Sequence, residues 1–198
     1  MHIRNVLFPI MFALLACSTS LDKQHLQIDT KPHIAPSLIL QHWKTTPFVL
    51  TQLVEGKFQD TTYQANFEIE WKDQTLTIVG LSLVGLPFFK AQVSATRTDL
   101  QLLIPDSEAH ALMDPAWIVS DFLLTRAPAE LLEDALLDSN LHIVSDTSLD
   151  RSLQRGDKTM VQIIYSEPSL FSSEVILNNL ELGYSIYIKN LRLEEINP

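Results

Sequence analysis

The chain has a single cysteine, Cys17, among its 198 residues. With no second thiol, an internal disulfide cannot form, and a disulfide role for Cys17 in folding is excluded. Basic residues are also scarce: 14 Lys and Arg stand against 24 Asp and Glu, and the formal net charge is −10. This acidic balance, without a basic cluster, argues against binding of nucleic acid and against electrostatic docking to anionic lipid headgroups.

Apolar runs are short, and none approaches the roughly 20 residues that a membrane-spanning helix needs. The run from Val6 to Ala16, preceded by Arg4, is typical of a signal-peptide core. It ends in Leu14-Leu15-Ala16-Cys17, which resembles the bacterial lipobox. We therefore expect residues 1–16 to be a lipoprotein signal peptide, cleaved between Ala16 and Cys17, with diacylglycerol and an N-acyl chain on Cys17. The alternative is an ordinary secretory signal that ends near a cysteine.

The residue after Cys17 bears on the destination of such a lipoprotein. An Asp directly after the lipidated cysteine resembles an inner-membrane retention signal of Gram-negative cells, but this chain has Ser18 there. We therefore expect an anchor on the periplasmic face of the outer membrane. Acyl chains, which gain about 0.8 kcal/mol per buried CH₂, would make that anchoring persistent. Residues 17–37 are polar, contain Pro32 and Pro36, and predict a flexible tether. Residues 38–198 have the length of a single domain.

Alternating apolar and polar residues predict antiparallel strands in both halves of this domain. The clearest is Tyr63–Trp71, which a turn at Lys72-Asp73-Gln74 joins to Thr75–Leu81. The other predicted strands are Phe48–Val54, Phe88–Ala95, Asp99–Ile104, Leu141–Val144, Thr159–Tyr165, Glu174–Leu177 and Tyr184–Ile188.

Two helices are predicted between the strands. Asp114 and Pro115 have the residue types of an N-cap and a first helical position, and this pattern continues to Arg126. Pro128 opens a second, shorter helix that ends near Asp138. Strands, a helical pair and strands again make the fold class α+β.

Catalytic constellations are weak. The six histidines show no metal-ligand spacing, so we expect no metal site and no cofactor beyond the covalent lipid. Glu68 and Glu70 share a strand face that is expected to be solvated, and the serines near residue 170 lack a nucleophile elbow. The sequence therefore favours a protein that is not an enzyme.

The order of motifs resembles a known family. The motifs are Leu76–Gly85, Trp117–Leu124, Arg151–Leu153 and Val161–Tyr165. Together they look like an uncharacterised family of outer-membrane lipoproteins found beside aryl polyene biosynthesis genes, and more remotely like LolB and LolA. The resemblance implies an unclosed β-barrel, a curved antiparallel sheet covered by two short helices, with an apolar cavity between. It also implies that Val84-Gly85 corresponds to an exposed apolar loop of LolB; the alternative is an ordinary turn.

The resemblance suggests an apolar ligand site under the helices, which would act as a lid. The candidate lining residues are large and apolar: Phe88, Phe89, Trp117, Phe122 and Leu132. Ordinary core packing explains them equally well. Two functions remain open at this point. One is binding or transfer of an amphiphilic, lipid-like ligand, in aryl polyene lipid or lipoprotein export; the other is a structural or interaction lipoprotein that docks an envelope protein.

Overall fold

A computed structural model describes residues 34–58, 60–104, 114–136, 139–169 and 171–196. Ten antiparallel strands form one sheet in the order β5-β4-β3-β2-β1-β10-β9-β8-β7-β6. The first five strands along the chain are β1 (Phe48–Phe58), β2 (Thr61–Lys72), β3 (Thr75–Leu81), β4 (Pro87–Ser94) and β5 (Thr98–Leu102). The last five are β6 (His142–Asp146), β7 (Asp150–Arg155), β8 (Lys158–Tyr165), β9 (Glu174–Asn179) and β10 (Tyr184–Glu195).

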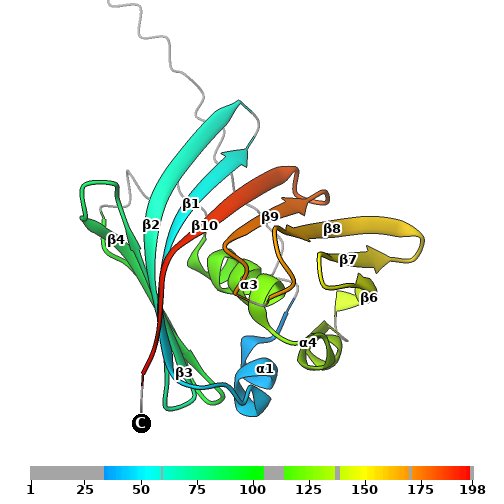
Figure 1. The fold of residues 1–198 in the computed structure, drawn as a ribbon, viewed down its shortest axis with the longest axis horizontal. Coiled ribbons are helices and arrows are strands. Elements are labelled where there is room, and N and C mark those ends of the chain that lie inside the picture. The colour runs from blue at the N-terminus through cyan, green and yellow to red at the C-terminus, as the bar shows by residue number, and fades with distance from the viewer. Residues whose placement is uncertain (1–33, 59, 105–113, 137–138, 170, 197–198) are drawn as a thin grey trace, which may run out of the picture.

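The sheet consists of two five-stranded meanders that meet where β1 pairs with β10. Each meander leaves one outer strand, β5 or β6, at an edge, so the sheet is strongly curved but not closed (Figure 1). The predicted α+β class and unclosed antiparallel sheet are thereby confirmed. The tight turn between β2 and β3 has Asp73 and Gln74 at positive φ, as a two-residue hairpin of this twist requires.

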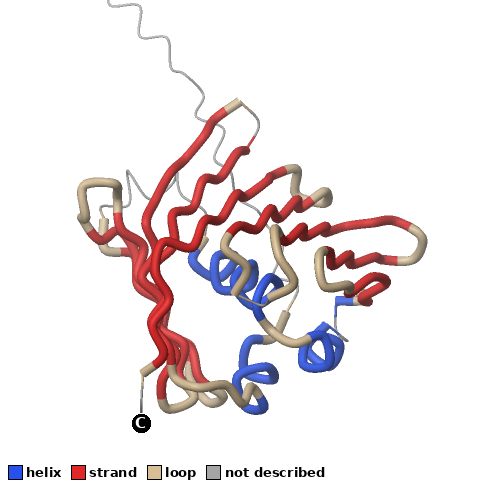
Figure 2. Tube along the Cα trace, viewed as in Figure 1, coloured by secondary structure: helices blue, strands red, loops and turns tan. Residues whose placement is uncertain are grey.

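Three helices lie in the described part of the chain: α1 (Pro36–His42), α3 (Pro115–Arg126) and α4 (Ala129–Leu136). Helix α3 crosses the concave side of the sheet, and α1 and α4 pack beside each other below it (Figures 1 and 2). The Asp114 side chain accepts a hydrogen bond from the Ala116 N–H at 2.8 Å, so the predicted N-cap is confirmed.

Two elements differ from the sequence prediction. Helix α1 lies partly in the segment expected to be a tether, and Ile34, Ile39 and Leu40 are buried. It was missed because seven residues are too short to show a helical period, and Pro36 stands at its first turn, where proline is favoured. Strand β7 was also missed, because its two buried inward positions include a charged residue, Arg151.

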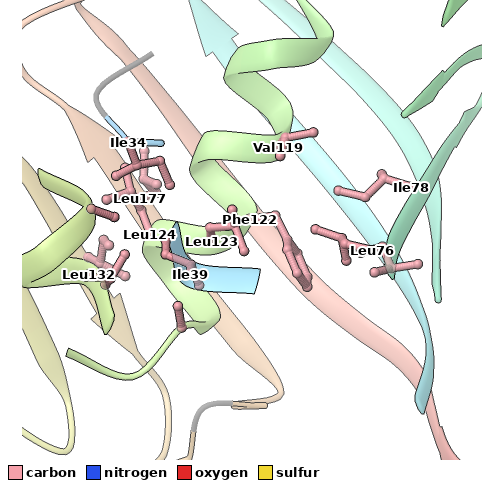
Figure 3. Packing of buried hydrophobic residues seen from close by; sticks show 14 of the residues in the cluster. Ile34, Ile39, Leu76, Ile78, Val119, Phe122, Leu123, Leu124, Leu132 and Leu177 are labelled. Atoms are coloured by element: carbon pink, nitrogen blue, oxygen red, sulfur yellow. The ribbon is translucent and has the colours of Figure 1, made fainter. Parts of the chain in front are cut away.

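One apolar core joins the concave face of the sheet to the three helices. Leu50, Ile69, Ile78 and Ala91 stand opposite one another across β1 to β4 and are fully buried. Figure 3 shows Val119 and Phe122 of α3 facing this layer, with Leu123 and Leu124 on the other side of the helix. Ten of the twelve residues of helix α3 are buried and Ala116 and Ile118 are half-buried, so the helix has no solvent-exposed polar face.

Candidate functional site: an apolar concave face and its rim

Burial of the concave face decreases toward the end of the sheet where β1 joins β2 and β3 joins β4. Beyond Gln52 on β1 and Ile69 on β2, the inward side chains are half-buried or exposed, and neighbours on β4 and α3 are half-buried as well. We call this set the open apolar face: Val54, Phe58, Phe67, Phe88 and Ile118. All of them pack against the core on one side and leave part of their surface to solvent.

Glycine at position 80 creates the aromatic part of this face. Gly80 pairs with Phe67 on one side and with Phe89 on the other. A Cβ at position 80 would lie 2.2 Å from the Phe89 ring and 2.7 Å from the Phe88 ring, so only glycine admits both rings here. The Phe89 ring meets Phe67 edge-on at 5.6 Å and Phe88 at 5.3 Å between centroids.

The turn between β3 and β4 exposes apolar side chains. The Gly85 N–H donates to the Ser82 carbonyl at 2.8 Å, and Gly85 has a φ of 84°, a conformation that suits glycine. Val84, just before it, is 82% exposed. The exposed leucines and valine at this end form what we call the apolar rim: Leu83, Val84, Leu86, Leu102 and Leu103. The rim adjoins the open apolar face, because Leu102 pairs with Phe89 and the Leu103 N–H donates to the Phe88 carbonyl.

The structure brings together only some of the predicted lining residues. Phe88 and Phe89 are in contact, with Phe89 buried and Phe88 half-exposed. Trp117, Phe122 and Leu132 are all buried. Phe122 packs 6.4 Å from Trp43, and Trp43 packs 5.3 Å from Trp71. Trp43 was missed, because it follows α1 in a segment whose helix was not recognised.

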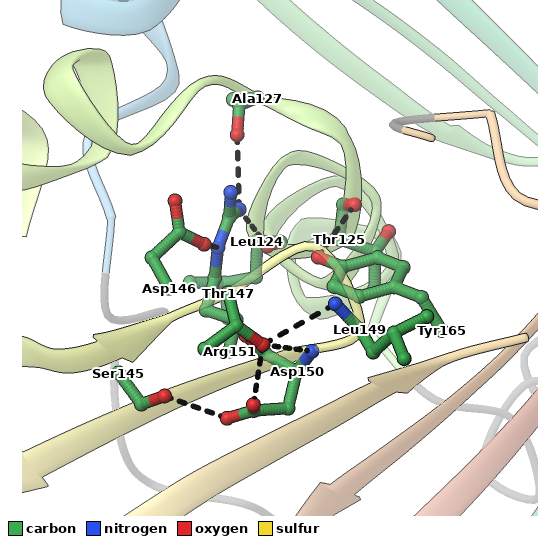
Figure 4. A network of polar contacts seen from close by, with 10 residues as sticks. All are labelled: Leu124, Thr125, Ala127, Ser145, Asp146, Thr147, Leu149, Asp150, Arg151 and Tyr165. Carbon is green, nitrogen blue, oxygen red and sulfur yellow. Dashed lines mark hydrogen bonds and ion pairs between the residues drawn. The ribbon is translucent and has the colours of Figure 1, made fainter. Parts of the chain in front are cut away.

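The C-terminal end of α3 is held by two buried side chains of the second meander (Figure 4). Arg151 Nη1 donates to the carbonyl oxygens of Leu124 at 2.7 Å and Ala127 at 2.9 Å, and its Nε pairs with Asp146 at 2.7 Å. The Tyr165 hydroxyl donates to the Thr125 carbonyl at 3.1 Å. These bonds satisfy carbonyl groups that a helix end leaves without intrahelical partners. Burial raises the pKa of Tyr165, so the hydroxyl keeps its proton.

A second polar contact fixes the middle of α3. The Tyr184 hydroxyl lies 2.9 Å from both carboxylate oxygens of Asp121, and Asn179 Nδ2 donates to that hydroxyl at 3.1 Å. Burial raises the pKa of Asp121 to about 7, against a smaller lowering by the Tyr184 hydrogen bond. Burial and the adjacent carboxylate also raise the pKa of Tyr184. Below about pH 7 the Asp121 carboxyl is therefore protonated inside the protein, while the Tyr184 hydroxyl keeps its proton.

A third polar network lies where the two meanders meet. Arg126 Nη2 and Gln52 Nε2 both donate to Asn190 Oδ1, at 3.2 and 2.8 Å. Asn190 Nδ2 in turn donates to the Ser172 carbonyl at 2.8 Å. Burial lowers the pKa of Arg126 to about 10, which still leaves the guanidinium charged at neutral pH. The sequence showed no signal for this network, because its members are far apart along the chain.

A polar cleft of about 200 Å³ lies beside the Arg151 contacts, between the β6–β7 turn and the segment that follows β8. Its lining is formed by Asp146, Thr147, Ser148, Arg151, Tyr165, Pro168 and Ser169. At about 200 Å³, the cleft is smaller than typical ligand pockets. The described residues contain no group of three His, Cys, Asp or Glu side chains that could hold a metal ion. None of the helices described is both long and apolar enough to cross a membrane.

The predicted cleavage and lipidation residues, Ala16 and Cys17, lie outside the described residues, as does most of the expected tether. The lipid anchor and the boundaries of the signal peptide therefore stay predictions.

Comparison with solved structures finds several similar folds. A LolA superfamily protein from Nitrosomonas europaea is 7% identical, with a TM-score of 0.45, over 83% of this chain and 94% of that one. A DUF1329 family protein from Desulfovibrio piger is 9% identical, with a TM-score of 0.36, over 84% and 94%. A domain described as an outer membrane lipoprotein-sorting protein, from Vibrio parahaemolyticus, is 7% identical, with a TM-score of 0.33, over 76% and 85%.

Comparison with curated protein sequences gives no match. A family model, by contrast, matches residues 49–192, a stretch that runs from β1 through both meanders to β10. The chain belongs to the family described as "Protein of unknown function (DUF3261)".

Proposed function

We propose that this chain is a lipoprotein of the bacterial envelope that binds or transfers an amphiphile on its open apolar face. The observation that carries the proposal is the continuity of that face with the exposed apolar rim. Apolar surface exposed to water is costly, about 25 cal/mol per Å², and contiguous exposed patches mark binding or membrane-contact sites. A turn closed by Gly85 needs no apolar neighbours, yet Leu83, Val84 and Leu86 are all exposed.

The chemistry of the face favours a lipid-like ligand. Its side chains are aliphatic and aromatic, and the chain as a whole is acidic, so recognition would depend on the apolar part of the ligand rather than on an anionic headgroup. An acyl-bearing lipid or a lipidated polyene has this character. The finer proposal is a role in aryl polyene lipid or lipoprotein export, without catalysis, from an anchor on Cys17 at the periplasmic face of the outer membrane.

Adjacent residues on β1 allow a matched test of binding. Val54 and Leu53 are both half-buried, but they point to opposite faces of the sheet, Val54 to the concave side. We expect Val54→Asp to weaken the affinity for a fluorescent fatty-acid probe by about tenfold or more. Leu53→Asp should weaken it by less than about twofold. At saturation both variants should bind the same number of probe molecules per protein as the wild type. Equal effects of the two substitutions, or a wild type that never binds the probe, would remove the support for an amphiphile site.

The second candidate is an interaction lipoprotein with a filled interior, and the burial of Trp117, Phe122 and Leu132 favours it. Extraction of the purified, detergent-free protein followed by mass spectrometry separates the two. A stoichiometric amphiphile supports the first proposal, and its absence from protein that also fails to bind the probe supports the second.

The anchor is tested separately. Cys17→Ala should abolish incorporation of radiolabelled palmitate and leave the protein unprocessed or soluble; persistent labelling would contradict the lipoprotein proposal. Sedimentation of the wild type with inner rather than outer membrane would contradict the sorting inferred from Ser18.

A further inference from the structure

Strand β10 has a neighbour on both sides along only half its length. Its partner β1 pairs with it from Tyr184 to Glu195, whereas β9 pairs with it only from Tyr184 to Lys189. Within the described residues, no strand lies on the β9 side of residues 191–195. We call this five-residue segment the β10 open edge. It follows the point where the chain before β9 turns away, marked by the Asn190 N–H donating to the Ser173 carbonyl at 2.8 Å.

The backbone of the β10 open edge is oriented for further pairing. The Ile196 N–H donates to the Pro47 carbonyl at 2.8 Å and so points toward the β1 side. Because N–H and C=O groups alternate in direction along an antiparallel strand, those of Leu193 and Glu195 point away from β1. An open row of such groups is a template for addition of another strand.

The side chains of the edge divide between two faces. Leu193 stands opposite Leu50 and therefore lies on the concave face, where it is 43% exposed. Arg192 and Glu194 stand opposite Thr51 and Val49, on the convex face. They form an ion pair with each other, and both side chains are more than half exposed. Leu191, at the irregularity of the β1–β10 ladder, is 54% exposed.

We propose that a second copy of this chain pairs with the β10 open edge, antiparallel, about a two-fold axis through Leu193. In this register Leu193 meets Leu193 of the partner subunit. Arg192 meets Glu194 of the partner subunit, and the symmetry repeats that contact. The outward N–H of Leu193 then donates to the outward carbonyl of Leu193 of the partner subunit, and the symmetry repeats that bond.

Charge complementarity selects both the register and the occupant. A two-fold axis at Arg192 would place arginine against arginine, and an axis at Glu194 would place glutamate against glutamate. Like charges directly opposite in a ladder are destabilising, and opposite charges are stabilising. Only the axis at Leu193 pairs opposite charges twice and joins two apolar side chains. Five residues a side make this a reversible contact.

Cysteine crosslinking of the full chain tests the geometry. Directly opposite antiparallel residues have Cα atoms about 5.5 Å apart, within the range of a disulfide. Leu193→Cys is compared with Leu180→Cys, an exposed position in the turn between β9 and β10, away from the open edge. It is also compared with the wild type, whose one cysteine is Cys17. We expect a crosslinked homodimer for Leu193→Cys at a yield at least about fivefold above both controls.

Charge exchange tests the register without added cysteine. Arg192→Glu and Glu194→Arg each break the intramolecular and the proposed intermolecular pair, so neither should self-associate. Mixed together, they restore opposite charges between copies only, and untagged Glu194→Arg should then co-purify with tagged Arg192→Glu. The proposal is overturned by equal crosslinking at positions 193 and 180, by crosslinking of position 193 to a different protein, or by mixtures that associate no better than either variant alone.

Discussion

The two meanders hold helix α3 in different ways. The second meander, β6 to β10, binds it through buried polar contacts: Arg151 and Tyr165 at its C-terminal end, and Tyr184 at Asp121. The first meander, β1 to β5, meets it through apolar side chains such as Leu76 and Ile78 (Figure 3). Hydrogen bonds fix position, whereas apolar contacts tolerate sliding and exchange of partners. An opening for a ligand is therefore expected between α3 and the first meander, and a lid movement that displaced α3 as a whole would break the polar contacts.

The largest effect is expected for a charge on the apolar side of α3. Phe122 is 5% exposed and packs against Trp43, so Phe122→Glu should lower the free energy of unfolding by about 4 kcal/mol or more and melt the domain. Ile118→Glu, on the half-buried part of the same helix, should keep the fold and weaken probe binding. Thermal melts beside probe displacement measure both. A folded Phe122→Glu protein that rejects the probe would instead mean that the ligand space extends to Phe122.

On the other side of α3, removal of a buried cation comes next. Arg151→Met leaves the carbonyls of Leu124 and Ala127 without their donor and Asp146 without its ion pair, so we expect a loss of about 3–5 kcal/mol. Arg155→Met breaks a more exposed pair with Glu181 and should cost less than about 1 kcal/mol. Denaturant unfolding compares them. Similar losses of unfolding free energy in the two variants would show that the buried polar contacts to α3 are not what holds this helix to the second meander.

The Asp121 contact predicts a pH dependence. Because the pKa of Asp121 is raised from 3.8 to about 7, its stabilising contribution is fully present below about pH 3.8 and is lost as the pH rises to about 7. Unfolding free energy of the wild type should therefore fall between pH 4 and pH 7 by about 2–4 kcal/mol more than that of Asp121→Asn. Tyr184→Phe removes the hydrogen bond that lowers this pKa and should move the fall to higher pH. If the unfolding free energies of wild type and Asp121→Asn changed in parallel with pH, Asp121 would not be the group that causes this pH dependence.

The smallest effect concerns the aromatic part of the open apolar face. Gly80→Ala places a methyl group against the Phe89 ring, and the rings of Phe88 and Phe89 must shift, at a cost of about 1–3 kcal/mol. Gly56→Ala, where no atom lies within 4 Å of the added Cβ, should change stability by less than about 1 kcal/mol. Denaturant midpoints and probe affinity of the two variants are compared. An unchanged Gly80→Ala protein would show that Phe88 and Phe89 move freely.

The sequence predicted the fold well where local patterns decide it. Strand alternation located β2, β3 and the turn at Asp73, and the Asp114-Pro115 pair located the start of α3. The same patterns did not reveal α1, which is too short for a visible period, or β7, whose inward-facing Arg151 breaks the apolar alternation.

In the candidate functional site, too, some features follow from local sequence and others only from the tertiary structure. The apolar turn at Val84-Gly85 is visible in the sequence, and the structure exposes Val84. The contact between Phe88 and Phe89 depends on an irregularity of the β3–β4 ladder that puts both rings beside Gly80, and local sequence does not show it. Only the tertiary structure decided that Phe122 packs on Trp43, that Arg151 caps α3 from β7, and that Tyr184 of β10 reaches Asp121 of α3. The tertiary structure also decided that β10 extends beyond the end of β9 and leaves an open edge. Sequence determines periodicity, caps and turns because these depend on neighbouring residues. Contacts between residues 27 to 79 positions apart depend on how the sheet curves, which no local pattern encodes.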